Sequence, residues 1–560
     1  MLFKNIIFIL IFTLFYQTPI YSKSNSFKDI NYKDLSKYFS GIVALENKDD
    51  TKALDFFNSS KILINQHDPY LKKYIYSLVN ENKISTAINV IKQNIDEDNT
   101  KFLDAYLLLI VDSLKKNNFK QAYNLLSNTY ELVDQNNFNL AILETLENYI
   151  FVFKENKIPN GNNNYGNLSI ISETFQRCYL EDPNTTAYFS NLINQNGGDF
   201  SRYTYFYLSY LVENNKVNEA QIISDDIEFI NSILLLSQAK SWIQDNSTHK
   251  FSEFFSCKNH NDIVSEFFFI ISNLYSSEND FAKSNFYLNL SNYLNPKFIF
   301  NLSLVVENQF QNGEFKKAKK TLKNFKKGDV FYYWYRIKKE AQIIAKQKNK
   351  KQSLDYLMSN FQKIQNPNNR ILLDVANFNR NSKKYEDAIE YYSKIIESLD
   401  DNDEIKSDLL YRRGGSYERI KKYQRADEDL TNSLKINPDD AYVLNYLAYS
   451  WLERNLKIDE AIEMLEIAYA AKNNDPYIID SIGWAYYLIK DYIKAENFLR
   501  RAVELMPNDP IVNDHYGDIL WKLDRKIQAR YFWSNVLALD NVDEEMLKKI
   551  DIKLVDGLEG

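Results

Sequence analysis

The side chains best suited to chemistry in this chain are two cysteines and four histidines. Cys257 and His260 are three residues apart, a spacing that places both on one face of a helix and that can ligate a metal ion. A zinc site needs four protein ligands, or three and a water molecule, and no second pair of ligands is near these two in the sequence. We therefore predict no metal site and no cofactor.

The two cysteines, Cys178 and Cys257, allow two interpretations. In an exported protein they could form a disulfide, which requires their Cα atoms to lie within about 7 Å of each other. The alternative is a pair of buried free thiols. The sequence leaves both alternatives open.

The motifs of common catalytic sites are missing. The sequence has no glycine-rich phosphate loop, no Gly-x-Ser-x-Gly nucleophile elbow and no zinc-protease helix motif. Carboxylates are plentiful, but on the helices of repeat proteins they usually form a solvated face. We predict no catalytic residues and no enzymatic activity.

The elements that carry these residues follow a repeat, which is clearest from Ser407 to about Asn541. A first small residue recurs there at steps of 34, 35 and 34 residues, and an alanine follows each one by 12 or 13 residues. The residues that we predict to pack between helices are Gly414, Ala426, Ala448, Ala461, Gly483, Ala495, Ala502, Gly517 and Ala529.

Small residues at this spacing predict pairs of closely packed helices. Glycine or alanine lets two helix axes approach to the short end of the usual range of about 8–10 Å. Pro438, Pro476 and Pro507 interrupt the helices, because proline lacks a backbone donor. A single hairpin leaves an apolar face that the next hairpin must cover, so the pattern predicts an all-α solenoid.

These marks resemble the tetratricopeptide repeat (TPR), which has a small residue at its eighth position, alanine at its twentieth and proline near its thirty-second. Weaker copies precede the clear block, with Ala53, Ala87 and Ala122 spaced 34 and 35 residues apart. The resemblance implies a superhelix of about 12 to 13 helical hairpins.

The chain is divided accordingly into six segments. They are a signal peptide (1–22), degenerate N-terminal repeats (23–140), an irregular insertion region with polar loops (141–205), further degenerate repeats (206–405), well-formed repeats (406–541), and a C-terminal capping helix and tail (542–560).

The N-terminus has the layout of a secretory signal. Lys4 precedes an apolar stretch from Ile6 to Tyr16, and Ser22 offers a small residue for cleavage. The stretch is too short to span a membrane comfortably. We predict an exported, periplasmic protein; an uncleaved, membrane-tethered form is the alternative.

Composition excludes several classes of protein. The chain has 13 glycines and 10 prolines among 560 residues, against about 12% in ordinary proteins, which disfavours a turn-rich β fold. The formal net charge of −7 and the pI near 5.5 argue against a nucleic-acid partner, which would require a basic face.

In the TPR fold the first helix of each hairpin lines a concave groove, and the resemblance implies which residues do so here. The residues that we predict to bind a partner are Tyr442, Asn445, Tyr449, Tyr477, Asp480, Trp484, Tyr487, Asp514, Asp518 and Trp521. Rigid aromatic side chains are common anchors of protein interfaces, and acids beside them favour a basic or polar peptide. The alternative is that several of the aromatic residues only pack between hairpins.

The run Asp-Ser-Ile-Gly-Trp-Ala-Tyr-Tyr from Asp480, with Asn513–Trp521 and Ala529–Trp533, resembles the C-terminal part of a family of exported bacterial TPR proteins. Its members include outer-membrane lipoprotein adaptors that deliver cell-wall hydrolases to a processing protease. This chain lacks the lipoprotein cysteine and so departs from those adaptors in its anchoring. The resemblance implies a non-enzymatic scaffold that binds a protein or peptide in cell-envelope maintenance.

Two alternative functions remain. An unrecognised hydrolase or transferase activity could lie within residues 141–260, where the repeat lapses and Cys178, Cys257 and His260 occur. The chain could also self-assemble through the ends of the solenoid.

Overall fold

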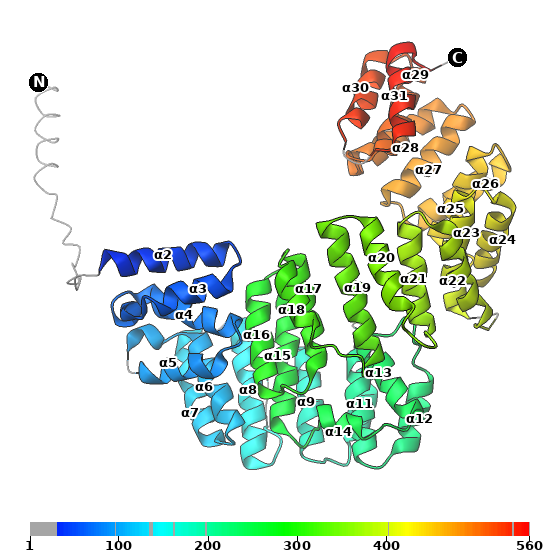
Figure 1. Cartoon of the computed structure of the whole chain (residues 1–560). Helices are drawn as coiled ribbons and strands as arrows, with labels where there is room; N and C mark the ends of the chain where they lie inside the picture. The colour runs from blue at the N-terminus through cyan, green and yellow to red at the C-terminus, as the bar shows by residue number, and fades with distance from the viewer. Residues whose placement is uncertain are drawn as a thin grey trace, which may run out of the picture. The chain divides into compact units, whose positions relative to one another are not determined.

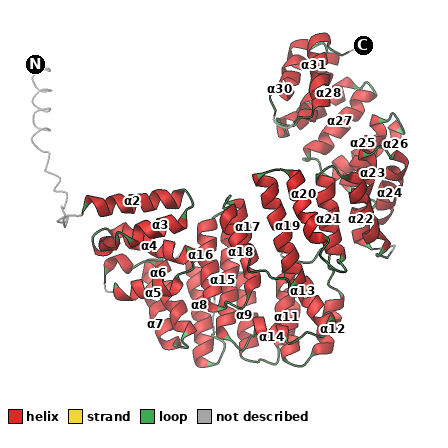
Figure 2. Cartoon of the chain, viewed as in Figure 1, coloured by secondary structure: helices red, strands yellow, loops and turns green. Residues whose placement is uncertain are grey.

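Every regular element in the part of the chain that the structure describes is a helix (Figure 2). The computed structural model describes residues 31–95, 97–133, 138–160, 163–195, 199–400, 403–539 and 542–558. None of the described helices combines the length and the apolar character needed to cross a membrane. The predicted all-α solenoid is confirmed, whereas the predicted signal peptide (1–22) lies outside the described residues.

The helices form two compact units, residues 1–343 and 344–560, and the boundary falls within α19 (Figure 1). The α-helices of the first unit are α2 (Tyr32–Glu46), α3 (Asp50–Asn58), α4 (Asp68–Asn80), α5 (Ile84–Gln93), α6 (Leu103–Lys115), α7 (Phe119–Thr129), α8 (Phe138–Glu155), α9 (Asn167–Tyr179), α10 (Thr185–Ile193), α11 (Ser201–Glu213), α12 (Val217–Asp225), α13 (Leu234–Gln244), α14 (Lys250–Phe254), α15 (His260–Ser277), α16 (Phe281–Leu294), α17 (Leu302–Gln311), α18 (Phe315–Leu322) and α19 (Val330–Gln347).

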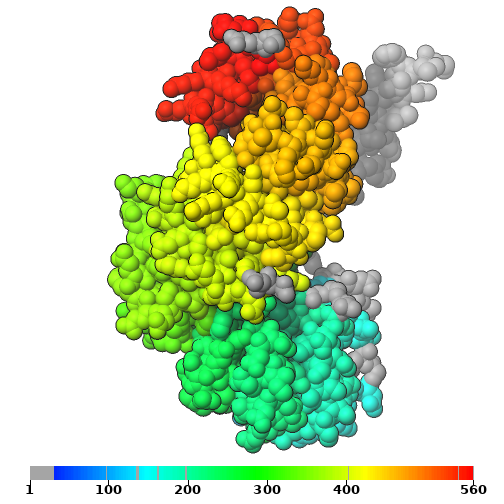
Figure 3. Space-filling view, turned by 90° about the vertical axis from the view of Figure 1, so that its right-hand side faces the viewer, coloured from blue at the N-terminus to red at the C-terminus, as the bar shows by residue number. Residues whose placement is uncertain are grey.

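The second unit is a stack of hairpins. In the space-filling view, each hairpin adjoins the next one along the chain (yellow through orange to red in Figure 3). Its helices are α20 (Lys350–Phe361), α21 (Asn369–Asn381), α22 (Tyr385–Glu397), α23 (Glu404–Arg419), α24 (Tyr423–Ile436), α25 (Ala441–Glu453), α26 (Ile458–Ala471), α27 (Pro476–Leu488), α28 (Tyr492–Leu505), α29 (Pro510–Lys522), α30 (Lys526–Leu537) and α31 (Glu544–Asp556).

Local sequence sets where these helices begin and turn. Asp440, Asp475 and Asp509 precede α25, α27 and α29, and each side chain accepts hydrogen bonds from two backbone N–H groups of the first turn. Pro476 is the first residue of α27 rather than the last of α26, a position where its missing donor costs nothing. Most hairpin turns contain one residue in the left-handed conformation, often asparagine, which tolerates it better than most side chains.

The small residues of the repeat lie in the seam between the two helices of a hairpin, but they do not simply face each other. A Cβ atom at Gly483 or Gly517 would collide with the side chain 16 residues further on, at 2.8 and 2.3 Å, and one at Gly414 would make a tight contact of 3.0 Å with the equivalent side chain; all three of these side chains are large and fully buried. Those large residues are Leu430, Leu499 and Trp533. Each glycine therefore makes room for a large side chain, and Ala426, Ala448, Ala461, Ala495, Ala502 and Ala529 are also buried.

Residues 141–205, for which we predicted an irregular insertion with polar loops, hold most of α8, all of α9 and α10 and the start of α11. The stretches 156–166 and 194–200 are not helical where the structure describes them. The helix α10 packs against both α9 and α11. This extra helix between hairpins explains why the period lapses here.

Candidate functional site

The two cysteines form a disulfide. Cys178 at the end of α9 and Cys257 in the turn before α15 have sulfur atoms 2.11 Å apart and Cα atoms 5.6 Å apart, and both side chains are buried. Of the two alternatives that the sequence left open, the structure selects the disulfide over the free thiols. Neither sulfur is a thiolate nucleophile in this state.

His260 is held by structural contacts. Its Nε2 atom lies 3.0 Å from the carbonyl oxygen of Leu114, and its ring contacts those of Phe119 and Phe153. Burial lowers the pKa of His260, so the ring is neutral near pH 7. Among the described residues, no three His, Cys, Asp or Glu side chains are grouped as metal ligands would be. The residues behind the hydrolase or transferase alternative therefore do not form a nucleophile and base.

The residues predicted to bind a partner lie on α25, α27 and α29, the first helices of three successive hairpins. These helices pack side by side, α25 against α27 and α27 against α29. We call the side that carries Tyr442, Tyr449, Tyr477, Trp484 and Tyr487 the first-helix face. This face contains side chains that are one repeat apart in the sequence, such as Tyr442 and Tyr477.

Aromatic side chains dominate this face. Tyr442 and Tyr477 are 49% and 55% exposed, and Tyr449 is half-buried. The indole of Trp484 is stacked between Tyr487 and His515, with ring centres 4.6 and 4.0 Å away. Because both faces of the indole are covered, the exposed tyrosines offer more surface to a partner than Trp484 does.

An acid that the sequence did not single out fixes this stack. The Nε1–H group of Trp484 donates to Oε1 of Glu453 at 3.0 Å, and Glu453 is exposed at the end of α25. Burial, together with the charge of Glu453, raises the pKa of Tyr449. Glu453 is thus an accessible carboxylate among the tyrosines.

The three predicted acids are buried instead. Asp480 is 5% exposed and its Oδ2 atom lies 2.8 Å from Nδ1 of His515. Burial opposes protonation of His515, but the carboxylates of Asp480, Asp514 and Asp518 outweigh it and raise the pKa of His515. His515 and Asp480 therefore form a buried hydrogen-bonded pair behind Trp484, in which the carboxylate favours the protonated ring.

Asp514 and Asp518 are covered by the last helix, α31. Lys553 of α31 donates to both carboxylates, to Asp518 at 2.6 Å, and Lys549 lies 3.4 Å from Asp514. Burial and repulsion by Asp514 raise the pKa of Asp518, which also accepts a hydrogen bond from Nε1 of Trp533 at 3.0 Å. These two acids bind the cap of the solenoid rather than facing solvent.

The remaining two predicted residues also have mainly structural contacts. Trp521 is half-buried against Trp533, with ring centres 5.4 Å apart, and a side chain at Gly557 would collide with its ring. Asn445 is half-buried, and its Oδ1 atom is buried with no partner among the described residues. For Trp521 and the three aspartates, the contacts are those of a core rather than of an open interface.

His515, Lys549 and Lys553, which the sequence analysis did not single out, could have been found from their spacing. Asp480 and His515, Asp514 and Lys549, and Asp518 and Lys553 are each 35 residues apart, one repeat length. Equivalent positions of successive first helices are neighbours, so opposite charges one period apart predict an ion pair. This spacing also identifies α31 as the equivalent of a further first helix.

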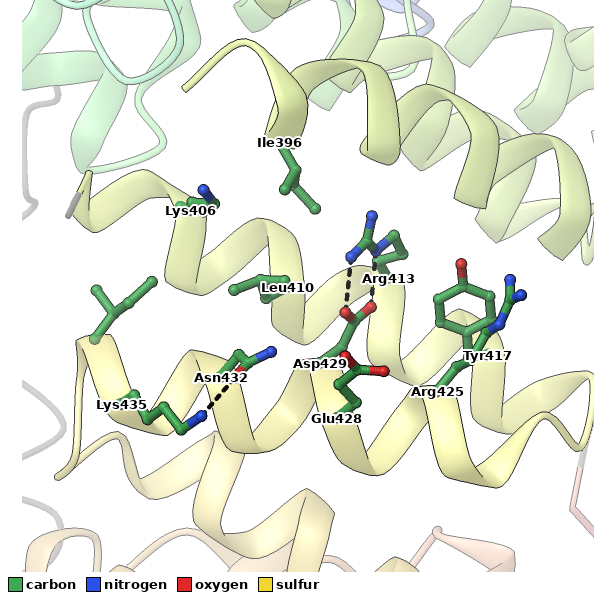
Figure 4. Close-up of a pocket in the computed structure, with 11 residues that line it drawn as sticks. Ile396, Lys406, Leu410, Arg413, Tyr417, Arg425, Glu428, Asp429, Asn432 and Lys435 are labelled. Carbon is green, nitrogen blue, oxygen red and sulfur yellow. Dashed lines mark hydrogen bonds and ion pairs between the residues drawn. The ribbon is translucent and has the colours of Figure 1, made fainter. Parts of the chain in front are cut away.

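A separate polar hollow of about 830 Å³ lies between α22, α23 and α24 (Figure 4). The guanidinium of Arg413 donates to both oxygens of Asp429, at 2.8 and 2.7 Å, and to Ser393 at 3.0 Å. The next three hairpins have apolar or aromatic pairs at the positions of Arg413 and Asp429, namely Leu447 and Met464, Ile482 and Phe498, and Tyr516 and Phe532. Because the charges of Arg413 and Asp429 neutralise each other, we interpret this hollow as a polar variant of the hairpin seam.

The sequence profile of the tetratricopeptide repeat family matches residues 407–440 and 478–509. A TPR repeat-containing protein of Pseudomonas aeruginosa is 30% identical over 147 residues, which cover 23% of this chain and 25% of that protein. A BBSome complex member of Bos taurus is 28% identical over 147 residues, which cover 26% of this chain and 27% of that protein. The chain thus spans about a quarter of the length of each relative.

Among solved structures, a tetratricopeptide repeat protein from Parabacteroides merdae is 16% identical and aligns with a TM-score of 0.38, over 46% of this chain and 98% of that chain. At these values the similarity carries no information on function. The family match and the hairpin architecture show that the chain contains tetratricopeptide repeats, as its marker residues predicted. Such repeats indicate a protein-interaction scaffold, a fold that is typically non-enzymatic.

Proposed function

We propose that this chain is an exported scaffold that holds a protein partner on the first-helix face. The observation that carries the proposal is the row of exposed tyrosines, Tyr442 and Tyr477, beside Tyr449 and the fixed stack around Trp484. Rigid aromatic side chains give large contact area for little loss of conformational entropy, which makes them strong anchors at interfaces.

The charge on this face favours a partner segment that carries lysine or arginine. Asp480, Asp514 and Asp518 are buried and paired with His515 or with the lysines of α31, so the accessible negative charge is that of Glu453. A cation placed beside Glu453 would also lie close to the ring of Tyr449, where cation–π attraction adds to the ion pair. We therefore expect the partner's cation to bind beside Glu453, and not along an acidic groove lined by all four carboxylates.

Export is part of the proposal. The apolar stretch from Ile6 to Tyr16 is typical of a secretory signal, and the Cys178–Cys257 disulfide is stable in an oxidising compartment such as the periplasm. The resemblance of Asp480–Tyr487 to exported TPR adaptors adds a role in cell-envelope maintenance, either free in the periplasm or tethered by an uncleaved signal.

A pull-down from the envelope fraction tests the proposal. The double variant Tyr449→Ala/Glu453→Gln removes an anchor and the accessible acid without touching the buried ion pairs. Tyr531→Ala is the matched control, because Tyr531 is 63% exposed but lies on α30, a second helix. We expect a partner retained by the wild type and by Tyr531→Ala but lost from the double variant; equal recovery by all three would refute the assignment of this face.

A further inference from the structure

The hairpin turns of the second unit lie along one edge of the stack. A Cβ atom at Gly414, Gly483 or Gly517 would meet the side chain 16 positions on, so each hairpin is antiparallel and the chain reverses at its turn. The chain reverses again at each link between hairpins, so the first helices run in the same direction and the links lie at the opposite edge. We call the turns, with the helix ends that flank them, the turn edge; the turns are residues 382–384, 420–422, 454–457, 489–491 and 523–525.

The two edges differ in charge. The five turns contain eight basic and two acidic residues, whereas the five links from α22 to α31 contain one basic and nine acidic residues in sequence. The six hairpin turns of the first unit show no such excess, with four basic and five acidic residues. A chain whose formal net charge is −7 therefore concentrates positive charge at the turn edge. Its basic residues are Lys383, Lys384, Lys421, Lys422, Arg454, Lys457, Lys490 and Arg525.

The conformation of the turns does not explain these lysines. The acids of the links have a structural role, because Asp440, Asp475 and Asp509 cap the helices that follow. Most hairpin turns contain a residue with positive φ, which asparagine tolerates better than lysine does. Four hairpins of the first unit have asparagine there, namely Asn82, Asn117, Asn215 and Asn279. Three hairpins of the second unit have lysine instead, namely Lys383, Lys421 and Lys490.

Aliphatic side chains project from the same edge. Leu456, Leu488 and Ile489 lie in or directly beside the third and fourth turns and are 46%, 36% and 44% exposed. Ile493 and Ile527 are the second residues of α28 and α30, and they are 70% and 87% exposed. Because α27 packs against α29, the turns that follow these two helices adjoin. The exposed aliphatic residues therefore lie at successive turns and are not scattered singly over the surface.

The combination of exposed lysine, leucine and isoleucine suits a membrane surface better than a protein interface. Protein interfaces are enriched in aromatic residues and arginine and are depleted of lysine. An anionic bilayer attracts each lysine to its headgroups, and aliphatic side chains enter the boundary between the headgroups and the acyl chains. The turn edge thus differs from the first-helix face, where the exposed anchors are tyrosines.

We propose that the turn edge of the second unit docks on an anionic lipid surface. Its lysines contact the headgroups, and Ile493 and Ile527 enter the boundary with the acyl chains. The site is separate from the first-helix face, because Tyr442 and Tyr477 are the second residues of α25 and α27, at the link ends of these helices. A scaffold docked in this way would hold its partner beside the membrane.

The test measures the fluorescence of a nitrobenzoxadiazole dye attached to the full-length protein through Ile527→Cys. The two native cysteines are joined in a buried disulfide, so the engineered thiol alone takes the dye. Vesicles of phosphatidylglycerol and phosphatidylcholine in equal parts should shift the emission to the blue, and vesicles of phosphatidylcholine alone should not. The control Ile467→Cys places the dye at a 50% exposed position in the half of α26 nearer its link, where we expect no shift. Because the dye reports on its own surroundings, membrane contact by the N-terminal apolar stretch would not reproduce this difference.

A second arm tests the contribution of charge. In the protein labelled at residue 527, Lys421→Gln/Lys422→Gln should raise the half-saturating lipid concentration about tenfold or more, because it removes two cations from the turn edge. The matched control Lys363→Gln/Lys472→Gln removes the same charge from two exposed lysines of the links and should leave this concentration unchanged. Melting curves by circular dichroism verify that both variants are folded.

The remaining outcomes separate this site from its alternatives. Tyr442→Ala/Tyr477→Ala should leave the blue shift unchanged, so failure of the first-helix face and failure of the turn edge are distinguishable. Poly-glutamate supplies negative charge without acyl chains and should cause no shift; the same shift with poly-glutamate would indicate an acidic polypeptide as the partner and would overturn the proposal. Equal shifts from Ile527→Cys and Ile467→Cys, or equal affinities of the two lysine variants, would overturn it as well.

Discussion

Replacement of Gly517 by alanine tests the packing rule of the repeats. A Cβ atom at this position would lie 2.3 Å from Nε1 and 2.4 Å from Cδ1 of Trp533. Trp533 is fully buried and donates its indole N–H to Asp518, so the ring can move only by giving up core contacts and this hydrogen bond. The substitution must displace the ring, the adjoining helix, or both.

The magnitude follows from three contributions. Overpacking of a core costs about 1–3 kcal/mol, and weakening a hydrogen bond to a charged group costs about 1.5–3 kcal/mol. The higher helix propensity of alanine returns about 1 kcal/mol. We expect Gly517→Ala to lower the free energy of unfolding of the second unit by about 1.5–5 kcal/mol.

Gly415 supplies the matched control, because it is also buried in a first helix. A Cβ atom there would be 3.4 Å from the hydroxyl of Tyr446, an ordinary contact, so Gly415→Ala should be neutral or stabilising by up to about 1 kcal/mol. Urea unfolding followed by tryptophan fluorescence reports mainly on the second unit, which holds Trp451, Trp484, Trp521 and Trp533 of the six tryptophans. The midpoint should fall by about 0.5 M or more for Gly517→Ala alone; equal midpoints for the two variants would refute the reasoning.

Three other perturbations have defined outcomes. Arg413→Met leaves the buried Asp429 without its partner and should cost about 3–5 kcal/mol in urea unfolding, whereas Arg413→Met/Asp429→Leu should cost far less; equal losses would contradict an ion pair in this seam. Replacement of Cys178 and Cys257 by alanine opens a link across 79 residues and should destabilise the first unit by about 4 kcal/mol, measured by thermal unfolding under oxidising conditions. The pKa of His515 is raised in the folded state, so its contribution to stability is full below about pH 6.5 and is lost as the pH rises through the raised pKa; the urea midpoint of the wild type should fall more between pH 6 and 9 than that of His515→Asn, and parallel curves would contradict the buried pair.

The fold could be predicted from the sequence because small residues recur at the equivalent position of several successive repeats. Glycine or alanine at Gly414, Ala448, Gly483 and Gly517 has one physical explanation, close packing, and four copies reinforce each other. What these residues meet could not be predicted, since the large partner 16 residues on varies from Leu430 to Trp533. Between α7 and α11 the period lapses because the extra helix α10 carries no repeat marker.

The candidate site was predicted less well, for a physical reason. Position in the repeat tells which helix face a residue shares, but not whether a neighbouring helix covers it. Asp514 and Asp518 have the register of groove residues, yet α31 places Lys553 between them. Accessibility depends on the ends of a solenoid, where the repeat gives no guidance, and Glu453 lies just outside the positions that the family pattern marks.

The central claim is that the first-helix face contacts a partner protein, and photo-crosslinking tests it most directly. The photoreactive residue p-benzoylphenylalanine would replace Tyr442, Tyr477 or, as a control, Tyr531 in the full-length protein expressed in its own cells. All three positions are about half or more exposed, so each can carry the probe without changing the core. We predict a crosslinked partner of the same mass from Tyr442 and Tyr477 and none from Tyr531. A partner crosslinked from Tyr531 alone, or none from either first-helix position, would contradict the account.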